Sequence, residues 1–180
     1  MRKLEMEELN RLDAESFKKS AKNNFCFILD NVRSLNNVGA AFRTGDAFLV
    51  DKIYLCGITG TPPDREINKT ALGATDTVAW EYRKKTEDII NELKKDGWKV
   101  FAIEQVAPKI YLQDFKPDAH SKYAFIFGNE VHGVDEHLLP LCDGCIEIPQ
   151  FGSKHSLNIA VTIGIVTWDY LSKTQLHMLL

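Results

Sequence analysis

The stretch 123–170 constrains the fold of this sequence more than any other part. It reads as a strand, a tight loop, a short helix, a second strand, another tight loop and a long helix. The first strand, 123–127, is apolar and aromatic, and it stops at Gly128, where a turn begins. The second strand, 145–148, is closed by Pro149. Two strands that each end in a polar loop before a helix indicate an open parallel α/β sheet.

The rest of the chain repeats this alternation. Apolar runs predict four more strands, at 25–29, 52–56, 77–82 and 98–103. Between these strands we expect a helix from 37 to about 48, a helical turn at 69–74 and a helix at 86–96. In the last third of the chain, we expect the short helix at 134–141 and the long helix from 155 to about 173. We therefore predict an α/β fold with a parallel sheet covered by helices on both faces. Ligands of such sheets bind beyond the carboxyl ends of the strands.

Length and composition point to one domain with a short extension. The chain has 180 residues and is 44% hydrophobic, enough for a sizeable core. Residues 1–23 are highly charged, and we expect a helical extension there, followed by the domain at 24–180. The extension is interpreted as a solvated helix on the core, because acids and bases nearly balance in it; an RNA-contacting extension is the alternative.

Several function classes find no support in the sequence. No apolar segment follows the charged start, and the most apolar run is too short and polar to span a bilayer, so we expect a cytoplasmic protein without a membrane partner. The pair Cys142 and Cys145 has C-x-x-C spacing but no second ligand pair, and we interpret it as structural. The histidines show no metal-ligand spacing, and no metal is expected.

Three segments in order resemble the motifs of the SpoU/TrmH branch of the SPOUT methyltransferases. They are Asn-Val-Gly-Ala-Ala-Phe-Arg at 37–43, Phe-Gly-Asn-Glu-Val-His-Gly at 127–133, and Ile-Pro-Gln-Phe-Gly-Ser-Lys-His-Ser-Leu-Asn at 148–158. The resemblance covers roughly residues 25–172. It implies a knotted α/β fold, S-adenosylmethionine as cofactor, a homodimer and 2′-O-methylation of RNA ribose.

The resemblance also implies which residues hold the cofactor. Gly128 has no side chain and would let the cofactor approach the backbone closely. Ile148 and Leu157 would enclose the adenine or ribose of the cofactor. Gln150 stands where many family members have Met, a change that leaves the backbone free to bind. The predicted cofactor set is Ile103, Glu104, Gly128, Ile148, Gln150, Ser156 and Leu157.

Among the predicted catalytic residues, the resemblance makes Arg43 the group that activates the ribose hydroxyl. A guanidinium holds its proton too firmly to be a general base, so we assign Arg43 to clamping a phosphate and stabilising the developing alkoxide. Glu130 is either the base or a carboxylate that binds backbone N–H groups beside Asn37; the sequence leaves both open. Asn37, Ser156 and Asn158 would position these groups by hydrogen bonding.

The last predicted helix, 155–173, is apolar nearly all round. Such a helix is buried on more than one side, either by its own chain or by a second subunit. The resemblance favours the homodimer. It also implies that the C-terminal segment threads through a loop as a trefoil knot, which a sequence pattern alone would never justify.

The expected partner is structured RNA, with tRNA favoured over rRNA. A net charge of −3 counts mildly against nucleic acid, but RNA binding needs only a local basic patch. Candidate contacts are Arg33, Arg43, Arg65, Lys69, Lys109 and Lys154. Three alternatives compete: a nicotinamide-dependent oxidoreductase, which would want a G-x-G-x-x-G fingerprint; a non-catalytic RNA-binding module on the same fold; and a base N-methyltransferase.

Overall fold

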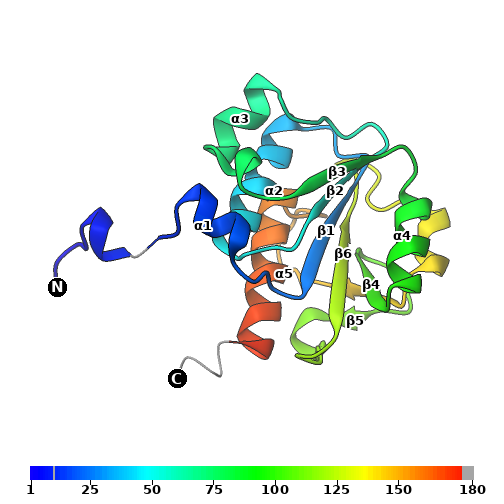
Figure 1. Ribbon diagram of the computed structural model, residues 1–180. Helices are drawn as coiled ribbons and strands as arrows, with labels where there is room; N and C mark the ends of the chain where they lie inside the picture. Colours follow the sequence, from blue (N-terminus) through cyan, green and yellow to red (C-terminus); the bar gives the residue numbers. More distant parts are fainter. Residues whose placement is uncertain (10, 176–180) are drawn as a thin grey trace.

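The computed structural model describes residues 1–9 and 11–175. Within them, seven strands form a single parallel sheet in the order β3-β2-β1-β6-β4-β7-β5 (Figure 1). The parallel α/β sheet predicted from the sequence is thus confirmed. The strands are β1 (Phe25–Asp30), β2 (Ile53–Cys56), β3 (Trp80–Arg83), β4 (Trp98–Ile103), β5 (Ile110–Tyr111), β6 (Lys122–Phe127) and β7 (Gly144–Glu147).

Helices cover both faces of the sheet, as predicted. On one face, α2 (Leu35–Ala47), α3 (Arg65–Ala71) and α5 (Ile159–Thr174) pack in one apolar cluster with Phe27 of β1. On the other face, α4 (Thr86–Lys95) and the 3-10 helix η4 (Glu136–Leu141) join a second cluster with Ile28. Successive side chains of a strand point to opposite faces, so Phe27 and Ile28 enter different clusters. Every residue of β1 is buried, which explains why all of them except the last, Asp30, are apolar.

The strand order brings distant loops together. β6 lies between β1 and β4, and β7 pairs with β4 on its other side. Because these strands are parallel, the segments that follow them emerge at one edge of the sheet. The loops after β1, β4, β6 and β7 therefore meet there, although they are far apart in sequence.

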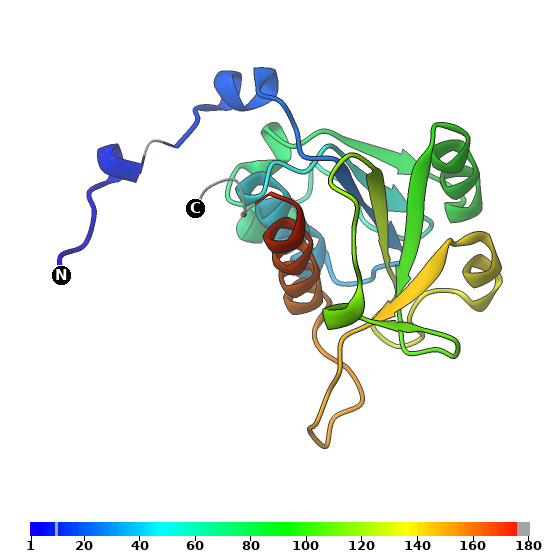
Figure 2. The same ribbon diagram turned by 90° about the horizontal axis from the view of Figure 1, so that it is seen from below.

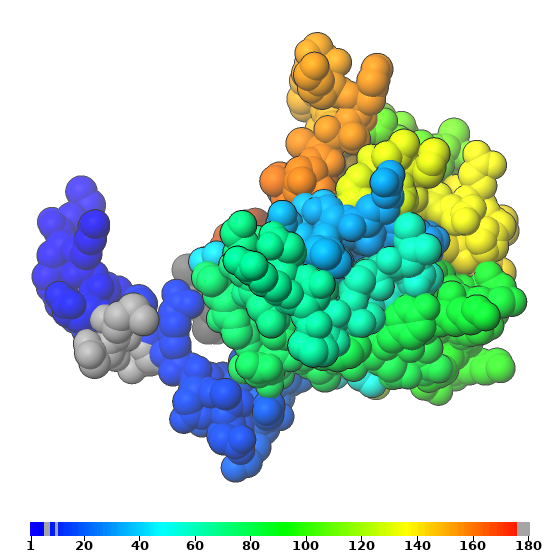
Figure 3. Space-filling model, turned by 90° about the horizontal axis from the view of Figure 1, so that it is seen from above, coloured from blue at the N-terminus to red at the C-terminus, as the bar shows by residue number. Residues whose placement is uncertain are grey.

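Several element boundaries differ from those predicted. α5 begins at Ile159 rather than at 155, because the side chain of Asn158 accepts a hydrogen bond from the N–H of Ala160 and caps the helix. The loop after β7 is therefore long, and it projects from the body in orange in Figures 2 and 3. α3 begins at Arg65, behind the cap Asp64, so the predicted turn at 69–74 begins inside this helix.

Two strands and the start of one helix also differ from the prediction. β3 begins at Trp80 rather than at 77, and the two-residue strand β5 was not predicted. A strand of two residues gives no alternation from which it could be recognised. α2 begins at Leu35, and its cap is Ser34.

The N-terminal extension is helical only in part. It contains the 3-10 helix η1 (Met6–Leu9) and α1 (Ala14–Lys19), and it leads away from the body in Figures 1 and 2. Phe17 of α1 is buried in the core cluster, whereas Leu4 and Leu12 are exposed. The boundary between residues 23 and 24 stays a prediction. None of the helices described is long and apolar enough to span a bilayer.

Candidate active site

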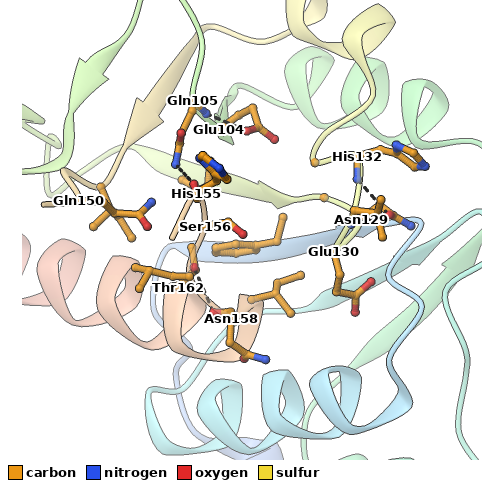
Figure 4. A pocket seen from close by; sticks show the side chains of 18 of the residues that line it. Glu104, Gln105, Asn129, Glu130, His132, Gln150, His155, Ser156, Asn158 and Thr162 are labelled. Carbon is orange, nitrogen blue, oxygen red and sulfur yellow. Dashed lines mark hydrogen bonds between the residues drawn. The ribbon is translucent and has the colours of Figure 1, made fainter. Parts of the chain in front are cut away.

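A cavity of about 490 Å³ opens at the carboxyl edge of the sheet. It lies among the loops that follow β4, β6 and β7 and the first turn of α5; Figure 4 shows Gln150, His155 and Ser156 facing Asn129, Glu130 and His132 across it. The structure brings the whole predicted cofactor set into its lining. These residues are Ile103, Glu104, Gly128, Ile148, Gln150, Ser156 and Leu157. That they bind a cofactor stays a prediction.

The sequence did not single out some residues that line this cavity. Gln105, His132 and Thr162 were not among the predicted site residues. The side chain of Gln105 donates a hydrogen bond to the carbonyl of His155 at 2.8 Å, which ties the loop after β4 to the loop after β7 (Figure 4). Its position just beyond a strand end was the available signal.

Two glycines let the loop after β6 fold tightly. A Cβ on Gly128 would lie 2.1 Å from the backbone nitrogen of Val134, so only glycine fits there without moving the chain. Gly133 has a φ of 70°, in the left-handed region, and exchanges two backbone hydrogen bonds of 2.8 Å with Asn129. The carboxylate of Glu104 accepts the N–H of Val134 at 2.8 Å, which holds this loop against the end of β4.

A hydrogen-bond network joins the three sequence motifs. Asn158 Nδ2 donates to Asn37 Oδ1 at 3.2 Å, and Asn37 Nδ2 donates to Glu130 Oε1 at 3.0 Å. The same carboxylate accepts the backbone N–H groups of Ser34 at 3.0 Å and Arg33 at 2.9 Å. The loop after β1, the first turn of α2, the loop after β6 and the cap of α5 are therefore held in one arrangement.

The surroundings of Glu130 favour one of its two possible roles. Burial raises the pKa of its carboxyl, but hydrogen bonds from Arg33, Asn37 and Ser34 outweigh burial and hold the pKa below its ordinary value. A carboxylate that is so well satisfied stays ionised and accepts a proton weakly. The geometry therefore favours the role in which Glu130 holds the loops together by hydrogen bonds over the role of general base.

Arg43 lies apart from the cavity lining. It follows Asn37 by six residues on α2, a rise of about 9 Å along the helix. Its side chain is exposed and makes no hydrogen bond or ion pair within residues 1–9 and 11–175. Of the five predicted catalytic residues, Glu130, Ser156 and Asn158 line the cavity, Asn37 is buried behind them, and Arg43 is free to meet a large ligand.

The remaining candidates take no part in this cavity. Burial raises the pKa of the Cys142 thiol to about 12, and its Sγ donates to the carbonyl of Leu138, which suits the structural interpretation. Across the described ranges, no three His, Cys, Asp or Glu side chains are grouped so as to hold a metal ion. Of the predicted basic contacts, Lys109 pairs with Glu147 and Lys69 pairs with Glu66.

Comparison with known proteins places the chain in a family. A model of the SpoU rRNA Methylase family matches residues 24–168. A tRNA (guanosine(18)-2′-O)-methyltransferase of Thermus thermophilus is 30% identical over 166 residues, which cover 92% of this chain and 83% of that protein.

Two solved structures share the fold. The TrmH/SpoU tRNA modifying enzyme of A. aeolicus superposes with a TM-score of 0.77 at 24% identity, over 89% of this chain and 79% of that one. The rRNA methyltransferase of Sinorhizobium meliloti with AdoMet bound has a TM-score of 0.77 at 27% identity, over 84% of this chain and 57% of that one. The chain therefore belongs to the SpoU rRNA Methylase family, which confirms the resemblance identified from its three motifs.

Proposed function

We propose that this protein transfers a methyl group from S-adenosylmethionine to the 2′-hydroxyl of a ribose in structured RNA. The observation that carries the proposal is the network of Asn158, Asn37 and Glu130, which fixes all three motifs beside one cavity. Membership of the SpoU rRNA Methylase family supports the same activity and argues against an oxidoreductase.

The cavity suits the cofactor. Its volume of about 490 Å³ lies within the range typical of small-molecule sites, and its lining combines apolar side chains such as Ile103 and Ile148 with polar ones such as Gln150 and Ser156. When bound, S-adenosylmethionine supplies a methyl group activated by a sulfonium. Ile103, Ile148 and Leu157 would enclose its apolar surface, and Gln150 and Ser156 would supply polar contacts, with backbone groups around Gly128.

Arg43 is proposed to act on the RNA rather than on the cofactor. A free, exposed guanidinium can make a two-pronged contact with a phosphate, and its charge can stabilise the alkoxide that develops on the neighbouring ribose. Asn37 and Glu130 hold the first turn of the helix that carries Arg43, so they position it. Much of the rate gain would come from this positioning.

We propose tRNA as the substrate, with rRNA as the alternative. The T. thermophilus tRNA methyltransferase is 30% identical over 92% of this chain, whereas the S. meliloti rRNA methyltransferase is 27% identical over 84% of it. With RNA as substrate, the protein would act in the cytoplasm.

We further propose a homodimer and a trefoil knot. Val161, Ile165 and Trp168 form an exposed apolar stripe along α5, at the spacing of one helix face, and Trp168 is 56% exposed. A second copy of the chain would bury this stripe. The knot is expected from the family, with the C-terminal segment threading through a preceding loop.

The function is tested with RNA substituted at the acceptor. The purified protein should methylate transcribed tRNA in the presence of S-adenosylmethionine, and nuclease digestion with mass spectrometry locates the modified nucleotide. Replacing that nucleotide by its 2′-deoxy form should abolish transfer, because the acceptor oxygen is gone. Methylation that persists on the deoxy substrate would show that a base is the acceptor.

The proposed dimer is tested by placing a charge in the apolar stripe of α5. Light scattering should give twice the chain mass for the native protein, whereas Trp168→Asp should give the monomer mass, since a charge in a buried apolar interface is strongly unfavourable. Leu72→Asp is the matched control, because Leu72 is also exposed but lies at the end of α3. A native protein that runs as a monomer at micromolar concentration would contradict the proposal.

A further inference from the structure

The loop between β7 and α5, residues 148–158, has more freedom than the rest of the site. It projects from the body in Figures 2 and 3. Residues 150–157 make no backbone-to-backbone hydrogen bond within the described chain, and the side chain of Gln105 provides the tie at His155. Such a loop can adjust to a ligand at little cost in protein structure.

Phe151 is the unusual residue of this loop. Its side chain is 98% exposed, although burial of a phenylalanine side chain is favourable. It stands beside Gln150, which lines the cavity, and His155, which lines the cavity too, follows four residues later. An aromatic ring exposed on a loop that lines a site is available to pack on a ligand bound there.

The charge of the loop identifies the class of partner. Residues 148–158 contain no Asp or Glu, and Lys154 is exposed without an ion pair in residues 1–9 and 11–175. An exposed aromatic ring and a free cation on the same loop match the chemistry of single-stranded RNA, in which unstacked bases pack on aromatic side chains and phosphates bind lysine. An apolar protein partner would gain nothing from this charge.

We propose that Phe151 stacks on an unpaired base beside the methylated nucleotide and that Lys154 contacts the adjoining phosphate. The inference rests on the proposed function, because it places the target ribose at the cavity that Gln150 and His155 line. A ribose whose neighbours are splayed out of a helix exposes its 2′-hydroxyl, so stacking would select nucleotides in RNA loops. Phe151 is thus assigned to substrate recognition rather than to catalysis.

The test compares Phe151→Ala, Phe151→Trp and Lys154→Ala by fluorescence anisotropy without a methyl donor. The probes are a labelled RNA stem-loop and the fully paired duplex of the same stem. Phe151→Ala should weaken stem-loop binding about tenfold and leave duplex binding unchanged, whereas Phe151→Trp should keep the native affinity. Lys154→Ala should weaken both and lower the salt dependence, which Phe151→Ala should not alter.

Two controls separate stacking from other uses of the ring. Calorimetry with S-adenosylhomocysteine should give the native affinity in Phe151→Ala, and light scattering should give the native mass. Unchanged stem-loop binding in Phe151→Ala overturns the proposal. Lost affinity for S-adenosylhomocysteine would instead assign the ring to the cofactor, and a changed mass would assign it to a subunit interface.

These measurements remain decisive if the proposed function fails. RNA binding is measured without transfer, so a protein that stacks RNA through Phe151 but methylates no ribose contradicts the proposed function alone. A protein that methylates ribose equally well with alanine and phenylalanine at this position contradicts the stacking proposal alone.

Discussion

Replacing Arg43 by alanine should lower the rate of methyl transfer by about a hundredfold to a thousandfold, the usual loss when one stabilising donor is removed. The exposed guanidinium has no partner in residues 1–9 and 11–175, so its removal leaves no buried group unsatisfied. The melting temperature and the affinity for S-adenosylhomocysteine should therefore stay near native. Transfer of a radioactive methyl group to tRNA, measured at saturating cofactor, gives the effect on kcat and KM separately.

Two further variants decide what the guanidinium does. Arg43→Lys keeps the charge but loses the planar two-pronged geometry, and it should also be strongly impaired. Lys95→Ala removes an exposed cation from the far end of α4, on the opposite face of the sheet, and should keep native activity. Near-native turnover in the lysine variant would rule out the clamp.

Gly128→Ala should abolish cofactor binding, with a loss in affinity of at least about a hundredfold, or ~2.7 kcal/mol. The added Cβ would lie 2.1 Å from the backbone of both Gly133 and Val134, and backbone atoms cannot rotate out of its way. The loop after β6 must then open, which displaces one wall of the cavity. Calorimetry with S-adenosylhomocysteine measures the affinity, and thermal unfolding reports the accompanying loss of stability.

Gly60→Ala is the matched control for this substitution. A Cβ on Gly60 would lie 2.3 Å from Cδ2 of Leu35, but this atom is the end of a side chain that can change rotamer. Gly60 also lies outside the cavity lining, so its variant should bind S-adenosylhomocysteine normally. Native affinity in Gly128→Ala would mean that the tight turn is dispensable for the cofactor.

Local pattern predicted most of the sheet. β1, β2, β4, β6 and β7 fall within about one residue of their predicted positions, because strands buried on both faces leave continuous apolar runs. The start of α5 was misplaced, because Ser156 and Asn158 both suit a cap and only the hydrogen bond to Ala160 distinguishes them. The seven predicted cofactor residues were chosen through the resemblance, and the topology gathers them at one edge of the sheet.

The sequence by itself determined the family and the parallel sheet and predicted part of the cavity lining, because these depend on local apolar pattern and on motifs of adjacent residues. Only the tertiary structure decided what the polar groups of the site do. Glu130 and Asn37 are 93 residues apart, and no local pattern could show that they share a hydrogen bond. The position of Arg43 likewise depends on how α2 packs. Its side chain lies outside the cavity lining and has no partner among the described residues. Long-range contacts of this kind set pKa values and side-chain roles, since a charge responds to everything near it in space and not to its neighbours in sequence.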